Sequence, residues 1–391
     1  MKALTWQGVN KLSVETVPDP RIQNTHDVVL RVIRSAACGS DLHLLGGYIP
    51  AMEKGDVLGH EFLGEVVEVG SSVQKHKVGD RVVVSSFIAC GKCWYCSKQL
   101  YSLCDNGNTN PGLTEFLWGS NPGGCFGYSH AMGGNAGSHA EYIRVPYADV
   151  GAFAVPDGVS DEAAVFASDA GPTGWMGADL GGVQPGDVVA VWGAGAVGQV
   201  SAQAAALLGA SKVVVIDGYP ERLQMARTYA GAETLDYTAV DVDAALRELT
   251  GGRGPDVAIE AVGMEAHSTG PQFPYDQAKQ QLRLQTDRPT AVRQAIYSTR
   301  KGGSVFVLGV FAGVVDKFPL GAAMNKGLTI RGAQMHGQRY IPMLLDRIEK
   351  GELRTAQFGT HVMPLSKAPK GYQQFKDKKD GCVRPVFLPG G

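Results

Sequence analysis

The middle of the chain carries a short run of apolar residues at 188–192, which begins after Asp187 and ends before Gly193. Such a run predicts a strand that is covered on both faces in a parallel sheet. A glycine-rich turn follows, then an apolar helix at 197–208 and a second apolar strand at 212–216. This order of strand, turn, helix and strand is the basic unit of a doubly wound parallel α/β sheet. Apolar strands predicted at 255–263 and 303–310 extend the same sheet.

The first 170 residues show another pattern, in which short apolar stretches are separated by glycine turns. It predicts strands at 1–6, 12–17 and 27–35, and a turn entering a further alternating strand at 59–70. Many short strands joined by tight turns predict a compact, mostly β domain.

The stretch 105–138 is rich in Gly and Asn, which predicts a long loop. Its aromatic residues include Phe116, Trp118, Phe126 and Tyr128. They either wall a substrate pocket or hold the loop against the core.

The remaining elements divide the chain. Residues 160–167 begin with Ser160, a good N-cap, and two acids, so they predict a helix. An amphipathic helix is predicted at 340–350, and a closing strand at 383–387. We therefore predict a mostly β domain at 1–170, a parallel-sheet domain at 171–334 and a return to the first domain at 335–391.

Composition narrows the class of protein. The 391 residues are 44% hydrophobic and 19% charged, as expected of a soluble globular enzyme, and the formal net charge of −2 gives no support to nucleic-acid binding. Residues 1–12 do not resemble a secretory signal, and the longest apolar stretch, 304–315, is too short to span a bilayer. We expect a cytoplasmic protein without a nucleic-acid or membrane partner.

The turn after the first strand of the sheet matches G-x-G-x-x-G, with its glycines at Gly193, Gly195 and Gly198. Such a turn lets a pyrophosphate approach the backbone and meet the N–H groups at the start of the next helix. Asp217 follows at the distance of about 20 residues where an acid binds the adenosine ribose. A carboxylate there repels a 2′-phosphate, which favours NAD over NADP. A βαβ crossover without a ligand is the alternative.

Four of the seven cysteines stand in one short lobe, 90–104, with the spacing C-x2-C-x2-C-x7-C. Four thiolates predict a closed, structural zinc site in a reducing compartment. An iron–sulfur cluster is the competing interpretation. A zinc ribbon that binds nucleic acid is another, but only Lys92 and Lys98 supply charge. The candidate ligands are Cys90, Cys93, Cys96 and Cys104.

Cys38, His60 and Glu61 are candidate ligands of a second zinc ion, because this metal accepts thiolate, imidazole and carboxylate. Each residue alone has a structural explanation; a lone cysteine is usually a small buried hydrophobe. The stretches 38–43 and 59–61, however, resemble the catalytic cysteine motif and the Gly-His-Glu motif of the zinc-dependent medium-chain alcohol dehydrogenases.

The resemblance implies a GroES-like, mostly β catalytic domain joined to a Rossmann domain with a doubly wound parallel sheet. It implies that Cys38 and His60 bind the catalytic zinc and that Glu61 is an adjacent, sometimes exchanging ligand. It also implies a proton relay from a metal-bound alcohol through Ser40 and the nicotinamide ribose to His43. Without the resemblance, Ser40 is a turn hydroxyl and His43 a surface imidazole.

Asp169 stands where most of the family has a cysteine as third protein ligand, just before a Thr-Gly pair. The aspartate makes the ligand set harder and richer in oxygen. It occurs in the branch that resembles glutathione-independent formaldehyde dehydrogenases. In that branch an extra loop near 264–289 covers the adenine and slows cofactor release. Without the resemblance, Asp169 is a helix N-cap.

The motifs and the resemblance together assign the cofactor contacts. Arg222 is otherwise a solvated helix charge, and Arg384, expected at the pyrophosphate, is otherwise a solvent-facing strand residue. Gly39 stands where many relatives have a basic phosphate contact, so that contact is expected to be lost. The predicted cofactor-binding residues are Thr173, Gly193, Gly195, Val197, Gly198, Asp217, Arg222, Val262, Gly309, Val310 and Arg384.

These observations predict a zinc-dependent oxidoreductase that transfers hydride between an alcohol, or a hydrated aldehyde such as formaldehyde, and NAD. Two zinc ions are expected per chain, one catalytic and one structural. Family habit suggests a homo-oligomer, either a dimer or a tetramer. The alternatives are an aldehyde dismutase with tightly bound NAD, a metal-free reductase of the same fold, and a non-enzymatic zinc-binding protein.

Overall fold

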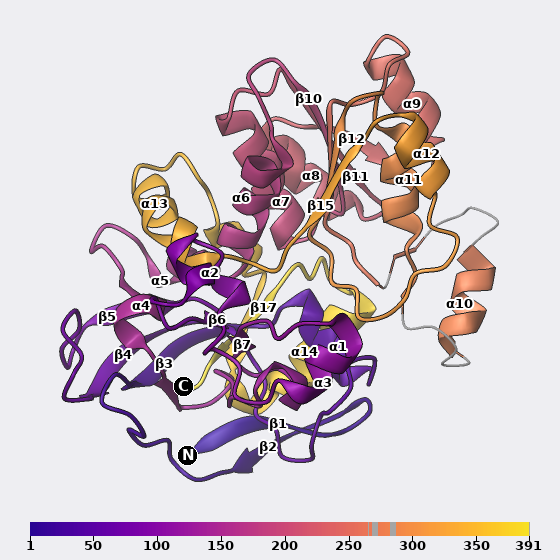
Figure 1. The fold of residues 1–391 in the computed structure, drawn as a ribbon. Helices are drawn as coiled ribbons and strands as arrows, with labels where there is room; N and C mark the ends of the chain where they lie inside the picture. The colour runs from indigo at the N-terminus through magenta and orange to yellow at the C-terminus, as the bar shows by residue number, and fades with distance from the viewer. Residues whose placement is uncertain (265, 268–272, 282–286, 391) are drawn as a thin grey trace. The chain divides into compact units, whose positions relative to one another are not determined.

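The computed structural model describes residues 1–264, 266–267, 273–281 and 287–390. They form two compact units, one of Met1–Pro172 with Met335–Gly391 and the other of Thr173–Gln334. Figure 1 shows the elements of both. The segment predicted to be an insertion, 264–289, lies partly outside the described residues.

The first unit is organised around strand β3 (Val28–Ala36), which pairs antiparallel with β4 (Glu61–Val69), β8 (Tyr142–Val145) and β17 (Pro385–Leu388). Strand β17 belongs to the C-terminal segment, so the end of the chain completes the sheet that the N-terminal half begins. The other strands of this sheet are β5 (Arg81–Val84), β9 (Ala152–Ala154) and β16 (His361–Pro364). Two smaller pairs join β1 (Lys2–Gly8) to β2 (Lys11–Thr16), and β6 (Phe87–Ile88) to β7 (Gly124–Cys125).

The core of this unit includes one of the aromatic residues of the predicted loop. Phe126 is buried beside alternate residues of β3, and its ring meets that of Phe62 edge to face with centroids 5.5 Å apart. Phe126 therefore holds this stretch against the core. Phe116, in contrast, is 85% exposed. It lies on a short helix, α3 (Gly112–Trp118), that the loop prediction missed and that ends at Gly119 with a φ of +70°.

Short helices connect the strands of the first unit. The predicted helix at 160–167 is present as α5 (Asp161–Ala164) and a 3₁₀ turn (Val165–Ala167), with the Ser160 hydroxyl accepting the N–H of Ala163. The amphipathic helix near the C-terminus is α13 (Gly337–Glu349). The others are α1 (Gly39–Leu45), α2 (Trp94–Ser97), α4 (Ala148–Gly151) and α14 (Ala368–Asp377).

The second unit is a six-stranded sheet in which every neighbouring pair is parallel. The apolar strand that leads into the glycine turn, β10, lies in the middle, and Val189, Ala190 and Val191 are fully buried, as the apolar run predicts. The spatial order is β12 (Glu233–Asp236), β11 (Lys212–Asp217), β10 (Val188–Trp192), β13 (Val257–Glu260), β14 (Ser304–Val307) and β15 (Thr329–Gly332).

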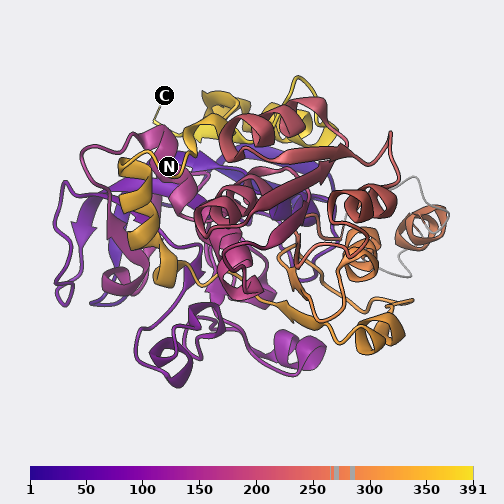
Figure 2. The ribbon, with the colours of Figure 1, turned by 90° about the horizontal axis from the view of Figure 1, so that it is seen from above.

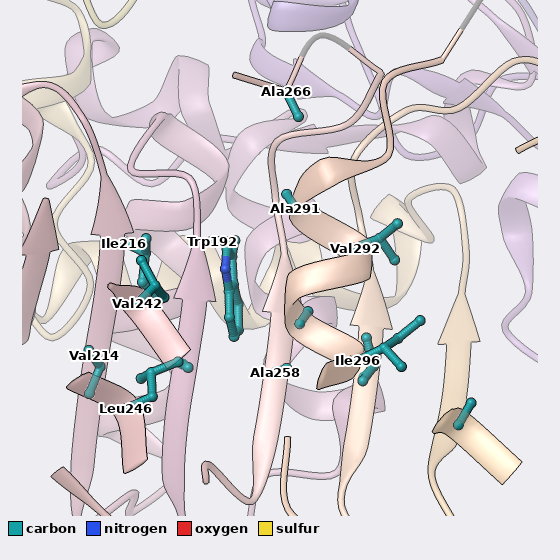
Figure 3. Close-up of a cluster of buried hydrophobic side chains, with 14 residues drawn as sticks. Trp192, Val214, Ile216, Val242, Leu246, Ala258, Ala266, Ala291, Val292 and Ile296 are labelled. Carbon is teal, nitrogen blue, oxygen red and sulfur yellow. The ribbon is translucent and has the colours of Figure 1, made fainter. Parts of the chain in front are cut away.

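Helices cover both faces of this sheet. On one face, α6 (Ala170–Gly181) comes so close that a Cβ at Gly177 would lie 3.1 Å from the Ile259 side chain, and α7 (Ala196–Leu207) lies against Val191. On the other, α9 (Val242–Leu249) and α11 (Thr290–Ser298) enclose a cluster around Trp192 (Figure 3).

The remaining helices of this unit are α8 (Pro220–Ala230), α10 (Phe273–Gln281) and α12 (Leu320–Asn325). Figure 2 shows α10 as the outermost of them. Over the ranges that the structure describes, no helix has both the length and the apolar character needed to cross a lipid bilayer.

We predict that Leu246→Ala lowers the free energy of unfolding of the second unit by about 2–5 kcal/mol, because the Leu246 side chain is fully buried in the cluster under α9. Urea titration followed by circular dichroism measures this change. Leu207→Ala is the matched control, because Leu207 is 39% exposed on α7 and its loss should stay within about 0.5 kcal/mol. Equal losses in the two variants would contradict the packing described.

Candidate metal and cofactor sites

The first site begins at the N-terminus of α1. Cys38 is the N-cap residue of this helix, and the Asp41 carboxylate accepts the Cys38 N–H at 2.8 Å. This reciprocal capping ties the cysteine to the first helical turn. Ser40 and His43 are three residues apart on α1, so their side chains project from one side of the helix.

His60 and Glu61 lie where the chain enters β4, and Asp169 directly precedes α6. One ligand atom each from Cys38, His60 and Asp169 lie within 4.8 Å of one another. All three residues are less than a tenth exposed. A thiolate, an imidazole and a carboxylate at this spacing fit zinc, and three protein ligands leave a fourth position for water or substrate.

Side chains around this cluster orient its members. The Ser86 hydroxyl donates to Asp169 Oδ1 at 2.9 Å, while Asp169 Oδ2 lies 3.8 Å from His60 Nε2. The Ser40 hydroxyl lies 3.3 Å from the same nitrogen. The structure thus brings Ser40 to the cluster, and His43 lies buried in the last turn of α1.

Glu61 lies beside the cluster but is not one of the three grouped residues. Its Oε1 accepts the N–H of Ala170 at 2.9 Å, and its Oε2 lies 3.9 Å from Arg384 Nε. Burial raises the pKa of Glu61 to about 8, although the Arg384 guanidinium opposes this shift. Glu61 is therefore held next to the three candidate ligands, where its carboxylate could serve as an additional, exchanging ligand.

Arg384 is buried rather than solvent-facing. Its guanidinium donates to the Ala37 carbonyl at 3.0 Å and to Cys38 Sγ at 3.6 Å. Burial opposes its charge, but the Cys38 sulfur and the Glu61 and Asp169 carboxylates outweigh burial and raise the pKa of Arg384. The guanidinium thus balances the negative charge of the cluster, and its contact with a pyrophosphate stays a prediction.

The four-cysteine lobe forms a second candidate metal site. Its sulfurs lie within 4.8 Å of one another, and none of them is in a disulfide. The Cys90 N–H donates to Cys104 Sγ at 3.2 Å, and the Asn106 amide to Cys90 Sγ at 3.3 Å. Burial opposes the Cys90 thiolate, but such N–H donors lower the pKa of Cys90 to about 6. Burial and the neighbouring sulfurs raise the pKa of Cys96, as expected of thiols that need a cation to share their charge.

The glycine turn of the second unit requires its glycines for different reasons. Gly193 has a φ of +92°, and a Cβ at Gly198 would lie 1.8 Å from the Gly193 carbonyl oxygen, so both are fixed by the fold. A Cβ at Gly195 would meet no atom within 4 Å, so the turn is open at the residue that precedes α7. The open space and the helix N-terminus fit a bound phosphate group.

Asp217, at the end of β11, is already a hydrogen-bond acceptor. Its carboxylate takes the N–H groups of Ala194 at 2.6 Å, Gly218 at 2.7 Å and Tyr219 at 3.1 Å. It therefore holds the glycine turn in place, and a ribose would use its remaining acceptor positions. Arg222 lies over the Tyr219 ring, 5.1 Å from the centroid.

The other predicted cofactor contacts gather at the carboxyl edge of the sheet. Glu260 accepts the N–H groups of Val262 at 2.9 Å and Gly263 at 2.7 Å, and a Cβ at Gly263 would lie 2.8 Å from the Val310 nitrogen. Val262 and the Gly309–Val310 pair therefore lie side by side, where open α/β sheets bind ligands.

Thr173 lies in α6 next to Gly174. A Cβ at Gly174 would lie 2.5 Å from the Val197 carbonyl oxygen, so Thr173 is close to the start of α7.

Comparison with known proteins agrees with this geometry. Residues 24–157 match the alcohol dehydrogenase GroES-like domain, and residues 196–271 the zinc-binding dehydrogenase model. The chain is 38% identical over its full length to AdhB of Bacillus subtilis (strain 168), a zinc-type alcohol dehydrogenase-like protein that is also fully covered. It is 35% identical to a glutathione-independent formaldehyde dehydrogenase of Pseudomonas aeruginosa (strain PAO1), over 96% of this chain and 94% of the relative.

The chain belongs to the zinc-dependent medium-chain alcohol dehydrogenases. The solved structure of the alcohol dehydrogenase TADH from Thermus sp. ATN1 superposes with a TM-score of 0.82 at 34% identity and covers 99% of both chains. The GroES-like and Rossmann domains predicted from the sequence are thereby confirmed.

Two residues of the candidate catalytic site escaped the sequence analysis. Asp41 carries a recognisable signal, because an acid three residues after an N-cap residue predicts a capping box, but that signal does not reveal its second contact, with His60. Ser86 carries none, since it reaches Asp169 across 83 positions of sequence.

We predict that Cys104→Ser removes one zinc ion per chain and lowers the midpoint of thermal unfolding by about 10 °C, or roughly 3 kcal/mol, because the lobe folds around its four sulfurs. Atomic emission counts the zinc, and calorimetry measures the midpoint. Cys382→Ser is the control, since it replaces a buried thiol that belongs to neither cluster. Unchanged zinc content in Cys104→Ser would refute the lobe as a metal site.

Proposed function

We propose that this alcohol dehydrogenase binds a catalytic zinc ion through Cys38, His60 and Asp169 and transfers hydride between NAD and an alcohol or hydrated aldehyde. The observation that carries the proposal is the meeting of sulfur, nitrogen and oxygen ligand atoms within 4.8 Å in a buried cluster. The four-cysteine lobe binds a second, structural zinc ion, and the active protein is a homo-oligomer.

When bound, the zinc ion supplies Lewis acidity, which lowers the pKa of a substrate hydroxyl. The Ser40 hydroxyl, 3.3 Å from His60 Nε2, is placed to receive the proton of that hydroxyl. His43, one helical turn further along α1, would be the final acceptor of the relay, with the nicotinamide ribose between it and Ser40. Ser86 and Arg384 hold Asp169 and Cys38 in position meanwhile.

The Rossmann unit supplies the cofactor specificity. The open turn at Gly195 and the N–H groups at the start of α7 receive the pyrophosphate. The Asp217 carboxylate stands where a 2′-phosphate would be repelled, which supports NAD as the cofactor. Formaldehyde is the substrate we propose to test first, because a glutathione-independent formaldehyde dehydrogenase is among the relatives.

We predict that Asp169→Ala loses one zinc ion per chain and at least about 100-fold in kcat/KM with formaldehyde and NAD, because several kcal/mol of charge stabilisation depend on the bound metal. Zinc content and initial rates test this. The control is Asp157→Ala, which removes an exposed carboxylate of the same unit. Full activity in Asp169→Ala would end the assignment.

A second candidate function is that of an aldehyde dismutase with tightly bound NAD. The observation that favours it is the set of ion pairs that hold α10 against its own unit. Asp276 on this helix forms a buried ion pair with Arg293, and Lys279 forms a partly exposed ion pair with Asp316, in the loop after β14. These pairs tie the described part of the inserted segment to α11 and to the loop after β14, as retention of a cofactor under this segment would require.

We predict that freshly purified protein, denatured in acid, releases close to one NAD per chain if α10 retains the cofactor. Chromatography of the released nucleotide measures its amount and distinguishes NAD from NADP. Near-stoichiometric NAD, with conversion of aldehyde to acid and alcohol in the absence of added cofactor, would establish the dismutase. Protein free of nucleotide that needs added NAD would establish the dehydrogenase and exclude the captive cofactor.

A further inference from the structure

The metal-facing nitrogen of His60 is Nε2, and its other ring nitrogen, Nδ1, lies 3.2 Å from Asp41 Oδ1. The second oxygen of Asp41 accepts the Cys38 N–H. A carboxylate behind a ligating histidine fixes the ring's orientation and its tautomer. The groups that hold the Asp41 carboxylate in place therefore also determine how firmly the His60 ring is held.

A line of buried polar side chains leads away from Asp41. His139 Nε2 lies 4.0 Å from Asp41 Oδ2 and 2.9 Å from the hydroxyl of Tyr372, on α14, which interacts with the same carboxylate. His139 Nδ1 lies 2.7 Å from the Ser35 hydroxyl, which is itself 2.7 Å from the Ser138 hydroxyl. All four of these side chains are at most 1% exposed, so water does not take the place of any of them.

The hydrogen bonds along this line have one consistent direction. The raised pKa of Tyr372 keeps its proton on the hydroxyl facing Asp41, whose carboxylate only accepts, so the Tyr372 oxygen is left to accept from His139 Nε2–H. His139 Nδ1 is then the acceptor, and the Ser35 hydroxyl donates to it. Burial lowers the pKa of His139 to about 4 and raises that of Tyr372, so the ring stays neutral and the phenol keeps its proton.

Packing holds the His139 ring in this place. Phe387 meets it edge to face, with ring centroids 4.9 Å apart. Gly59, the residue before His60, has a φ of +101°, and a Cβ there would lie 2.6 Å from His139 Nδ1. The glycine that precedes the metal ligand therefore makes room for His139.

We propose that Tyr372, His139 and Ser35 are positioning residues for the metal ligand His60, which they hold through Asp41. The inference rests on the catalytic zinc site proposed above. We expect these residues to slow the loss of zinc from the cluster of Cys38, His60 and Asp169, because they hold in place the Asp41 carboxylate that His60 Nδ1 faces at 3.2 Å.

The test measures the rate at which zinc passes from the loaded protein to an excess of a chromogenic chelator. Tyr372→Phe should speed release from the catalytic site by up to about 10-fold, the lower end of the effect of losing a direct outer partner of a ligating histidine, because Tyr372 acts through Asp41. Ser35→Ala should speed it severalfold, because His139 Nδ1 then loses its hydrogen-bond partner and the ring holds the Tyr372 hydroxyl less firmly. Zinc release is expected in two kinetic phases, one from each site, and the phase of the four-cysteine site is the internal reference. Asp169→Ala identifies that phase, because this variant lacks the zinc of the catalytic site.

The matched control is Ser138→Ala. Ser138 is as buried as Ser35 and is next to it in the line, but Ser35 can still donate to His139 without it. Faster release in Ser35→Ala than in Ser138→Ala, with the four-cysteine phase unchanged, supports the proposal even if Tyr372→Phe does not fold. Equal rates in the two serine variants, or acceleration of both zinc phases together, would show a general packing role and overturn it. A wild-type protein without catalytic zinc would overturn the proposed function as well.

Discussion

One buried carboxylate, that of Asp41, joins the two parts of the chain that meet at the candidate catalytic metal site. With one oxygen it caps the helix that begins at Cys38, and with the other it faces the imidazole of His60. Burial opposes its charge, but His60 more than compensates and lowers the pKa of Asp41. The thiolate and the imidazole are therefore positioned by the same group before any metal arrives, which reduces the ordering that metal binding must impose.

Concentrated negative charge in a buried site requires a counter-charge, and Arg384 supplies it. Its guanidinium contacts Cys38 and lies near Glu61, and the residue directly precedes β17, the last strand of the described chain. The C-terminal segment also contributes Tyr372 and Phe387, which surround His139. The C-terminal segment thus does more than add a strand to the sheet of the first unit. The electrostatic balance of the site and the packing behind His60 both depend on this segment.

The sequence was sufficient for everything that local spacing specifies. The glycine turn at 193–198, the apolar strand before it and the four-cysteine lobe all appear in the structure where their patterns predict them. Each depends on contacts between residues near one another in the chain, or on a repeat that burial imposes. The candidate ligands Cys38 and His60 were also found, because each lies in a short motif.

Side chains whose role depends on distant partners could not be predicted in this way. His139 reaches Tyr372 across 233 positions, and nothing in its own neighbourhood indicates that its ring is buried and neutral. Arg384 is a second example of this limit. A strand pattern predicts that successive side chains alternate between the two faces of a sheet, but the elements packed against the sheet determine which face meets a buried cluster. The structure places its guanidinium against the Cys38 sulfur, so an arginine expected at a cofactor phosphate also balances the charge of the metal ligands.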